Sequence, residues 1–171
     1  NIIQHVAIMH HVKAFPRIPE KPYSGILNYC QSINHLKLTS YVGAWKGALE
    51  NILKSPGYYL SYRSSVNHWI EFDFDCKVVK LLSYEIQSIT SDYNYLYPIS
   101  WKMMGSNDRN KWDDLDVRTN CNELKEVNRD AYFACNLQSR NYYRYIRFLQ
   151  TKGSDSIFLH ISRIELYGNV F

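Results

Sequence analysis

The feature that most constrains the fold of this chain is a strict alternation of side chains on either side of a turn near its middle. Trp101 and Met103 fall on one side of an extended backbone, and Lys102 falls on the other. A cluster of turn-forming residues follows at 105–110, and a second apolar segment opens at Trp112. Alternation with a period of two around a turn rich in Gly, Asn and Asp is typical of a β-hairpin. The segment therefore predicts a hairpin at the centre of a sheet protein.

Similar short segments recur along the chain, and they indicate a β-sandwich or jelly roll. The 15 tyrosines fit this prediction, because tyrosine favours pleated, half-buried surfaces. A short helical turn is expected at 48–53, before Pro56 and Gly57. The predicted strands occupy residues 33–40, 69–74, 78–89, 100–117, 131–137, 142–151 and 158–167, and the predicted loops occupy residues 41–47, 91–98, 120–130 and 151–156.

The first 24 residues differ in pattern from the rest. Residues 2–15 are apolar and rich in histidine, which predicts a short helix. Pro16, Pro19 and Pro22 follow and predict an extended linker. We therefore expect an N-terminal segment over residues 1–24, one domain over residues 25–168 and a C-terminal tail over residues 169–171.

Charge and hydropathy exclude two classes of partner. The 20 Lys and Arg residues exceed the 16 Asp and Glu residues by only 4, and the basic residues are dispersed, so nucleic-acid binding is not predicted. Strand alternation would place Arg144 and Arg147 on opposite faces, so they do not form one basic patch. No apolar run approaches the roughly 18 residues of a membrane span, so no transmembrane segment is predicted.

The cysteines and histidines indicate neither a metal site nor a cofactor. The 4 cysteines have no CxxC spacing, which argues against a zinc or redox motif. His5, His10 and His11 would not align on a helix as ligands. His68 and His160 are expected to have packing or surface roles. Cysteine usage favours a reducing, intracellular compartment.

Three carboxylates beside Trp112 raise the question of a glycosidase. Asp114 and Asp116 would share a strand face just after the hairpin turn, with Asp113 adjacent. Such a position is normally a solvated edge. The chain also lacks a phosphate-binding loop and a dinucleotide fingerprint. No catalytic residue is therefore predicted, and an enzyme is not expected.

Five segments, in order, carry a resemblance to one family. They read Trp69-Ile-Glu-Phe-Asp-Phe, Ser83-Tyr-Glu-Ile-Gln-Ser, Ser100-Trp-Lys-Met-Met-Gly-Ser-Asn-Asp with Trp112, Tyr143-Arg-Tyr-Ile-Arg-Phe and Ile161-Ser-Arg-Ile-Glu-Leu-Tyr-Gly. Over residues 25–168 the chain resembles a discoidin domain (coagulation factor 5/8 type C) of the galactose-binding-like superfamily. The variant resembles those of multidomain intracellular proteins of protists such as trichomonads. The resemblance implies an all-β jelly-roll sandwich, here with a short helical or extended N-terminal appendage.

The resemblance also implies that ligands contact loops at one end of the sandwich. Those loops would be residues 41–47, 57–65 and 91–97. Aromatic rings with a few cations suit stacking on sugars or gripping a protein. Alternatively, about half of these tyrosines pack beneath their own loops. The candidate ligand- or partner-binding residues are Tyr41, Trp45, Lys46, Tyr58, Tyr59, Tyr62, Arg63, Tyr93, Tyr95 and Tyr97.

The chain departs from the family pattern in two ways. Secreted members close the domain with a disulfide between its ends, and here no cysteine follows Cys135. Some members hold a structural calcium near the first strand, and between residues 36 and 67 this chain offers only Glu50 as a carboxylate. The first departure favours the intracellular group, and the second argues against calcium.

Two functions follow as expectations, both of a non-catalytic binding module. The first is an intracellular protein-interaction or structural adaptor domain with protein partners. Its location would be cytoplasmic or cytoskeletal, with a ciliary or axonemal assembly as one setting. The alternative is a lectin-like domain of a secreted or surface protein that binds carbohydrate or lipid head groups. Free thiols would favour the first and disulfides the second.

Overall fold

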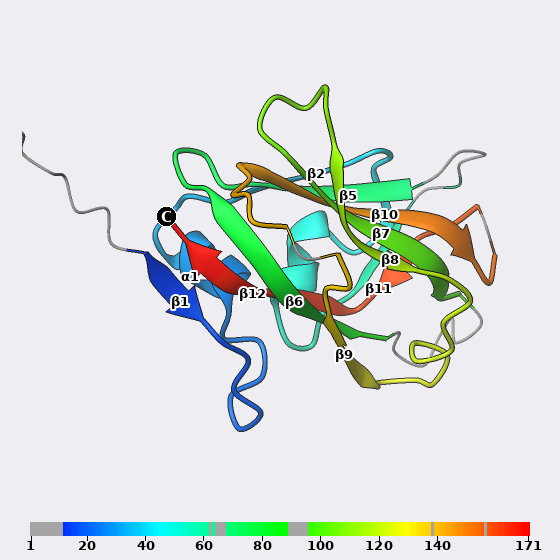
Figure 1. The fold of residues 1–171 in the computed structure, drawn as a ribbon. Helices are drawn as coiled ribbons and strands as arrows, with labels where there is room; N and C mark the ends of the chain where they lie inside the picture. The colour runs from blue at the N-terminus through cyan, green and yellow to red at the C-terminus, as the bar shows by residue number, and fades with distance from the viewer. Residues whose placement is uncertain (1–11, 62, 64–67, 89–95, 138, 156) are drawn as a thin grey trace, which may run out of the picture.

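The computed structural model describes residues 12–61, 63, 68–88, 96–137, 139–155 and 157–171. These residues form a β-sandwich with one short α-helix, α1 (Ile26–Ser32), and one 3-10 helix, η1 (Leu49–Leu53) (Figure 1). The strands are β1 (Lys13–Phe15), β2 (Lys37–Ser40), β3 (Ala44–Lys46), β4 (Tyr59–Ser61), β5 (His68–Asp73), β6 (Val79–Gln87), β7 (Pro98–Ser106), β8 (Asp113–Arg118), β9 (Asp130–Ala134), β10 (Tyr145–Gly153), β11 (His160–Ile161) and β12 (Arg163–Val170).

The strands form two main sheets and a small one. The five-stranded sheet has the order β2-β5-β10-β7-β8, and the four-stranded sheet has the order β1-β12-β6-β9. A three-stranded sheet, β11-β4-β3, lies beside them. The strand pairs among the described residues are antiparallel, including the predicted hairpin of β7 and β8. The all-β sandwich predicted from the alternating segments is thereby confirmed.

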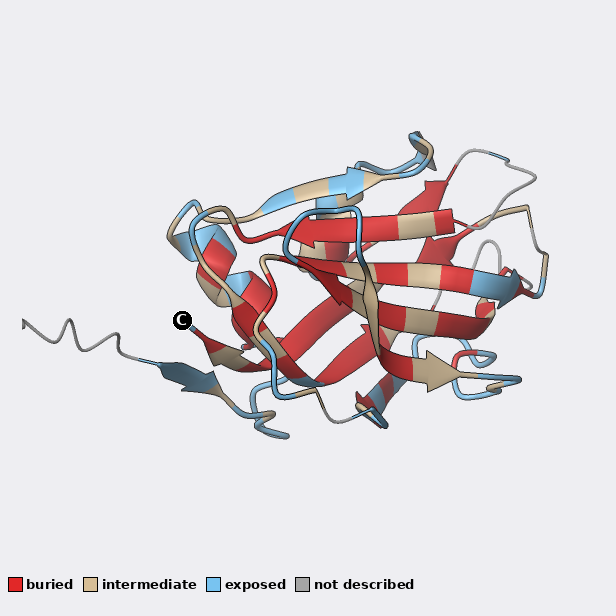
Figure 2. Ribbon diagram, turned by 45° about the horizontal axis from the view of Figure 1, so that its top comes forward, coloured by how far each residue is buried: buried red, intermediate tan, exposed pale blue. Residues whose placement is uncertain are grey.

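The core lies between the inner faces of the two main sheets, where buried residues alternate with more exposed ones along the strands (Figure 2). Trp101 of the five-stranded sheet meets Phe133 of the four-stranded sheet edge to face, with 5.1 Å between ring centroids. Phe148 stacks on Trp101 with 6.0 Å between ring centroids. Aromatic side chains dominate the energetics of such a core because each removes a large apolar area from water.

Helix α1 was not predicted, because a tertiary contact begins it. The carboxylate of Glu165, from β12, accepts hydrogen bonds from the backbone N–H groups of Leu27 (2.7 Å) and Asn28 (3.2 Å). A β-carbon at Gly25 would lie 2.2 Å from the carbonyl oxygen of Leu166, so only glycine allows this approach. Burial raises the pKa of Glu165. The start of α1 is therefore fixed by a carboxylate from β12 that accepts its first N–H groups, and not by a capping residue in the local sequence.

The N-terminal segment is corrected in one part. Residues 13–15 were expected in a helix, and they form β1, whose Lys13 pairs with Val170 and whose Phe15 pairs with Gly168 of β12. An open strand edge binds an extended segment through its unpaired peptide groups, which outweighs a weak local helical preference. The rest of the predicted helix, up to residue 11, lies outside the described residues. The division of the chain at residues 24 and 25 stays a prediction.

The strand ends define two ends of the sandwich. The loop end comprises the described residues 41–43, 96–97, 119–129 and 154–159, which follow or precede strands at one end of the sheets. The opposite end comprises residues 33–36, 74–78, 107–112 and the described residues of 135–144. Among the described residues, no helix has the length and apolar character that crossing a bilayer requires.

Candidate ligand-binding loops

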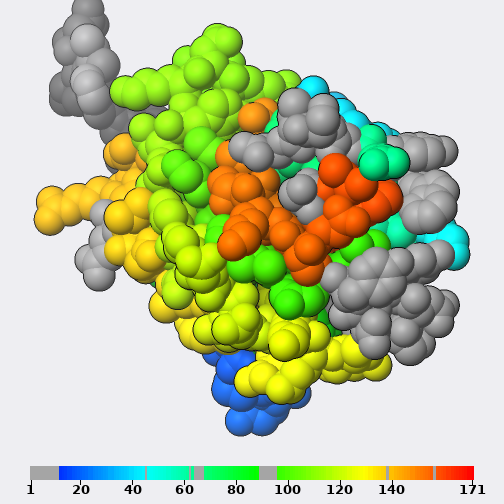
Figure 3. All heavy atoms as spheres, turned by 90° about the vertical axis from the view of Figure 1, so that its right-hand side faces the viewer, coloured from blue at the N-terminus to red at the C-terminus, as the bar shows by residue number. Residues whose placement is uncertain are grey.

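At the loop end, hydrogen bonds join the loops that connect neighbouring strands. Figure 3 views this end, with the chain after β8 in yellow below the chain after β10 in orange. The N–H of Tyr97 donates to Oγ of Ser154 at 2.8 Å, and the N–H of Ser154 donates to the carbonyl of Tyr97 at 2.9 Å. The N–H of Cys121 donates to the carbonyl of Ile99 at 2.8 Å. These bonds fix neighbouring loops to one another, so the scaffold positions whatever side chains they carry.

Three predicted binding residues are exposed in this region. The side chain of Tyr41 is 48% exposed, and its ring meets the edge of Trp69 with 6.0 Å between centroids. The N–H of Tyr41 donates to the carbonyl of Trp69 at 3.1 Å, which holds the residue to β5. Lys46 and Arg63 are exposed as well. An exposed aromatic ring is a surface on which a sugar ring can stack.

Three other predicted binding residues are partly or fully buried. Tyr59 was expected in a loop and lies instead in β4, where it is 1% exposed and donates its hydroxyl to the carbonyl of Val42 at 3.2 Å. Tyr97 is half-buried and packs against the core. Tyr58 is half-buried, and its ring meets that of His160 at 5.0 Å and 74°. The alternative of tyrosines packing beneath their own loops is correct for Tyr59, because its ring is part of the hydrophobic core.

The remaining candidates are not placed by the structure. Tyr62, Tyr93 and Tyr95 lie outside the described residues, and so does the side chain of Trp45, whose backbone belongs to β3. The pairing of β3 with β4 sets Lys46 beside Leu60. The assignment of Tyr62, Tyr93, Tyr95 and Trp45 as binding residues stays a prediction.

Two buried histidines underlie the loop end. His68 and His160 are each 1% exposed, and His68 pairs with Gln150 across β5 and β10. Burial lowers the pKa of His160 to about 4, and burial also lowers that of His68. Nε2 of Gln150 donates to the carbonyl of Phe158 at 2.7 Å. Both rings are therefore neutral near pH 7, and the loops rest on a layer of uncharged polar groups.

The loop between β8 and β9 forms a polar hollow that the sequence pattern did not single out. The hollow has a volume of about 660 Å³. Nζ of Lys152 donates to Oδ1 of Asn120 at 3.3 Å and so joins the hollow to β10. Amide, carboxylate and basic groups line it together, among them Asn120, Asn122, Glu123, Lys125, Glu126 and Arg129. Only the polarity of residues 120–130 hinted at this.

The carboxylates after the hairpin turn are already engaged. Asp114 accepts from Nζ of Lys102 at 2.7 Å, and Asp113 accepts from the hydroxyl of Tyr143 at 2.9 Å. Asp116 was expected beside Asp114 on a solvated face, and it is fully buried.

The reason is a bulge at Leu115. Asp114 pairs with Met104 and Asp116 pairs with Met103, so two steps along β8 match one step along β7. Asp116 thereby turns inward and accepts hydrogen bonds from the hydroxyl of Tyr84 (2.5 Å) and Nε of Arg118 (2.8 Å). The paired-carboxylate arrangement of a glycosidase is absent from these three residues.

The positions of Arg144 and Arg147 need a second correction. Arg144 and Arg147 were expected on opposite faces, and they join one cluster on the outer face of the five-stranded sheet. Arg144 precedes the first residue of β10, so strand alternation does not govern it. Its Nε donates to Asp73 at 2.9 Å, and Nη2 of Arg147 donates to Glu71 at 2.8 Å.

Comparison with known proteins gives one kind of match. No protein-family model matches the chain, and no curated protein sequence matches it. Solved structures do match. The module CpGH89CBM32-5 from Clostridium perfringens, in complex with GalNAc-β-1,3-galactose, has 11% identity and a TM-score of 0.61, over 81% of this chain and 96% of its own.

Two further structures are similar to the same extent. The family 32 CBM of Clostridium perfringens NanJ, in complex with galactose, has 11% identity and a TM-score of 0.62, over 78% of this chain and 94% of its own. The C-terminal domain of a chitobiase from Bacteroides fragilis has 15% identity and a TM-score of 0.61, over 80% of this chain and 95% of its own. The chain therefore has the discoidin, or galactose-binding-like, fold that the sequence resemblance implies. The protist variant stays a prediction.

Proposed function

We propose that this chain is a non-catalytic carbohydrate-binding module that takes galactose-type sugars at its loop end. The observation that carries the proposal is the match to sandwiches solved with galactose and with GalNAc-β-1,3-galactose, over about four fifths of the chain. The exposed ring of Tyr41 at the loop end supplies the kind of surface that such a ligand needs.

The state of the carboxylates supports a binding role without catalysis. Asp113, Asp114 and Asp116 each accept a hydrogen bond from another side chain, and Asp116 is closed off from solvent. A general acid or nucleophile must reach the reacting atoms of a sugar, which a fully buried carboxylate does not do. The module therefore holds its ligand and leaves the chemistry to other proteins or domains.

The structural matches favour carbohydrate over the adaptor function that the sequence placed first. The solved neighbours are carbohydrate-binding modules, and none of the three described above is a cytoskeletal adaptor. The intracellular location and the protein partners stay predictions.

The test is a titration of the purified chain with galactose, with GalNAc-β-1,3-galactose and with glucose, followed by NMR chemical shifts and calorimetry. We expect saturable binding of the two galactosides and weaker binding of glucose. Tyr41→Ala removes the exposed ring and should weaken galactoside binding about tenfold, equivalent to about 1.4 kcal/mol.

Tyr132→Ala is the matched control. Tyr132 lies in β9 and is 46% exposed, close to the 48% of Tyr41, but it lies on the outer face of the four-stranded sheet. Its loss should leave sugar binding unchanged. Absence of saturable binding by the intact chain, or an equal loss in both variants, would overturn the proposal.

A further inference from the structure

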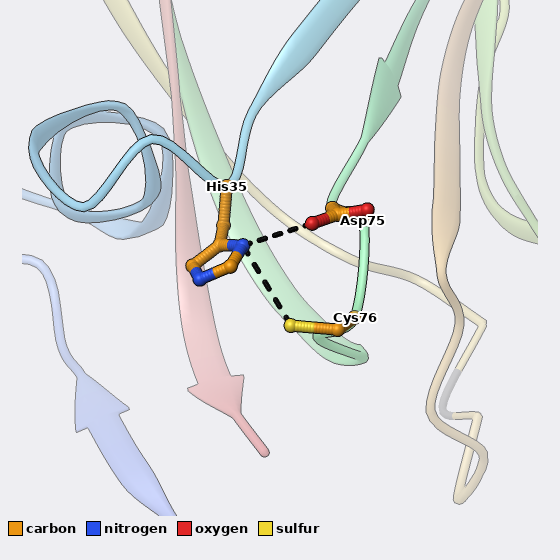
Figure 4. A group of neighbouring side chains, drawn as sticks. All are labelled: His35, Asp75 and Cys76. Atoms are coloured by element: carbon orange, nitrogen blue, oxygen red, sulfur yellow. Dashed lines mark hydrogen bonds and ion pairs between the residues drawn. The ribbon is translucent and has the colours of Figure 1, made fainter.

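Two turns at the opposite end bring together three side chains with different ligand atoms. His35 lies between α1 and β2, and Asp75 and Cys76 lie between β5 and β6. Their side chains converge from the two turns (Figure 4). Nδ1 of His35 lies 3.0 Å from Oδ2 of Asp75 and 3.6 Å from Sγ of Cys76, and the three atoms all lie within 4.8 Å of one another.

Two of these separations, from Nδ1 of His35 to the oxygen and to the sulfur, are close to those around a tetrahedral zinc ion. Zinc binds imidazole nitrogen and carboxylate oxygen at about 2.0–2.2 Å and thiolate sulfur at about 2.3 Å. At tetrahedral angles, those bond lengths set nitrogen and oxygen about 3.3 Å apart, and nitrogen and sulfur about 3.6 Å apart. The observed distances of 3.0 and 3.6 Å therefore need only a small adjustment.

One ring nitrogen faces both partners, and this distinguishes the cluster from simpler arrangements. Nδ1 carries either one proton or one lone pair, so it can make one good hydrogen bond. A proton relay would set the ring between the thiol and the carboxylate, with one partner at each nitrogen. Here Asp75 and Cys76 both approach Nδ1. A cation among the three atoms satisfies all of them at once.

Other contacts hold both turns in place. The N–H of Asp75 donates to Oδ1 of Asp73 at 2.8 Å, and Asp73 is itself paired with Arg144 at 2.9 Å. The N–H of His35 donates to the carbonyl of Cys30 at 2.9 Å, which ties it to the end of α1. Cys76 is exposed and has a free thiol. The ligands are thus pre-positioned, and the approach to the sulfur is open to solvent.

We propose that His35, Asp75 and Cys76 form a zinc site with three protein ligands and a water molecule in the fourth position. The ligand set of nitrogen, oxygen and sulfur suits Zn²⁺ over Mg²⁺ or Ca²⁺, which take oxygen ligands. The ion links the turn after α1 to the turn after β5. It binds the folded chain and not the unfolded one, so it stabilises the fold.

Cobalt titration of the full chain tests the site directly, since Co²⁺ substitutes for Zn²⁺ and reports its ligands in its absorption spectrum. We expect one equivalent of Co²⁺ to give a thiolate-to-metal charge-transfer band that Zn²⁺ abolishes. Cys76→Ser should remove the band and weaken Zn²⁺ binding at least about tenfold, as loss of even an outer-shell partner does. The histidines at positions 5, 10 and 11 cannot produce a thiolate band.

Cys121→Ser is the matched control, because Cys121 is also a free thiol and lies at the loop end. It should keep the band. Saturating Zn²⁺ should raise the midpoint of thermal unfolding by roughly 5 °C in the intact chain and in Cys121→Ser, but not in Cys76→Ser or His35→Gln. Circular dichroism of the metal-free variants checks that they fold. A band that survives Cys76→Ser, or no band at all in the intact chain, would overturn the proposal.

Discussion

The two ends of the sandwich are held together by different kinds of bond. Toward the opposite end, charged side chains of several strands bond to one another across the outer face of the five-stranded sheet. Arg109 donates to Glu71 at 2.8 Å and to Asp73 at 3.2 Å. At the loop end, the ties described above run largely through backbone groups, as between Tyr97 and Ser154. One end therefore depends on side-chain identity for its stability, while the other keeps side chains exposed for a ligand.

Aromatic rings also contact the charged face, which is the cluster of Glu71, Asp73, Arg109, Arg144 and Arg147 on the outer face of the five-stranded sheet. The guanidinium of Arg147 lies 4.1 Å from the ring centroid of Trp69 and 4.0 Å from that of Trp112, so it is held between two indoles. That of Arg109 lies 4.1 Å from the ring of Tyr145. Each cation is therefore attracted to a ring face as well as to its carboxylate partner. This face is therefore stabilised by contacts between charged and aromatic side chains.

Removal of one buried carboxylate should destabilise the protein most. Glu71 is 2% exposed and receives hydrogen bonds from Arg109 and Arg147. Glu71→Ala leaves both guanidinium groups without this partner, and we expect the free energy of unfolding to fall by roughly 2–3 kcal/mol, somewhat less than for a fully buried pair. Denaturation in urea measures it.

The matched control for Glu71→Ala is Glu126→Ala at the loop end. Glu126 pairs with Arg129 three residues away, and its side chain is 72% exposed. Its loss should cost less than about 0.5 kcal/mol, because exposed pairs contribute little. Equal losses in the two variants would show that the charged face has no special structural role.

The groups at the two ends should lose their contributions to stability in different ranges of pH. The folded pKa of His160 is lowered to about 4 by burial, below its unfolded value near 6.5, so the unfolded chain binds more protons between these values. Stability should therefore fall as the pH drops from 6.5 to 4, by up to about 1.4 kcal/mol per pH unit for this group. His160→Gln should flatten that slope in urea denaturation.

The charged face should respond in a lower window of pH. Burial pushes the pKa of Asp73 up, but the hydrogen bonds from Arg144 and from the N–H of Asp75 outweigh it and hold the pKa below its usual value of 3.8. Its contribution to stability is thus complete above that value and lost as the pH falls through the lowered pKa. Because burial also lowers the pKa of His68, the decisive variant carries both His68→Gln and His160→Gln, and a steep loss of its stability between pH 6.5 and 4 would contradict this separation.

The smallest expected change in stability comes from replacing the planar guanidinium group of Arg147 by an ammonium group. Arg147→Lys keeps the charge but loses the planar group that lies between Trp69 and Trp112. We expect a loss of about 1 kcal/mol in unfolding free energy, within the range of cation–π contacts at partly buried sites. Lys102→Arg, in a half-buried pair with Asp114 that has no aromatic stack, should change stability by less than half as much. Similar values for the two exchanges would mean that the stack contributes nothing beyond charge.

The elements predicted from sequence are those whose pattern is local. Alternation located the hairpin of β7 and β8 and the strands β5, β6 and β10, because residues two apart share a face. Helix α1 and strand β1 were missed, since Glu165 begins one and the edge of β12 recruits the other. Both partners lie more than a hundred residues away along the chain, where no local pattern reports them.

The structure places some of the predicted binding residues, while their role in binding stays a prediction. The loops that end the strands were identified by resemblance, and Tyr41 is exposed there as expected. The prediction for Tyr59 was wrong because a short strand, β4, formed inside a predicted loop, and all three residues of that strand are buried. The cluster of His35 with Cys76 was invisible in the sequence, because the residues are separated by the whole of β2 to β5 and meet only when two turns pack together.

The three residues of β1 have a consequence for how copies of this protein behave near one another. β1 covers the edge of β12, and the strand is short, starts with Lys13 and is followed at once by Pro16. A short strand with a charge and a proline offers little for another chain to extend, which is how natural sheets resist edge-to-edge aggregation. Deletion of residues 12–16 would expose the long edge of β12, and the shortened protein should lose solubility at high concentration.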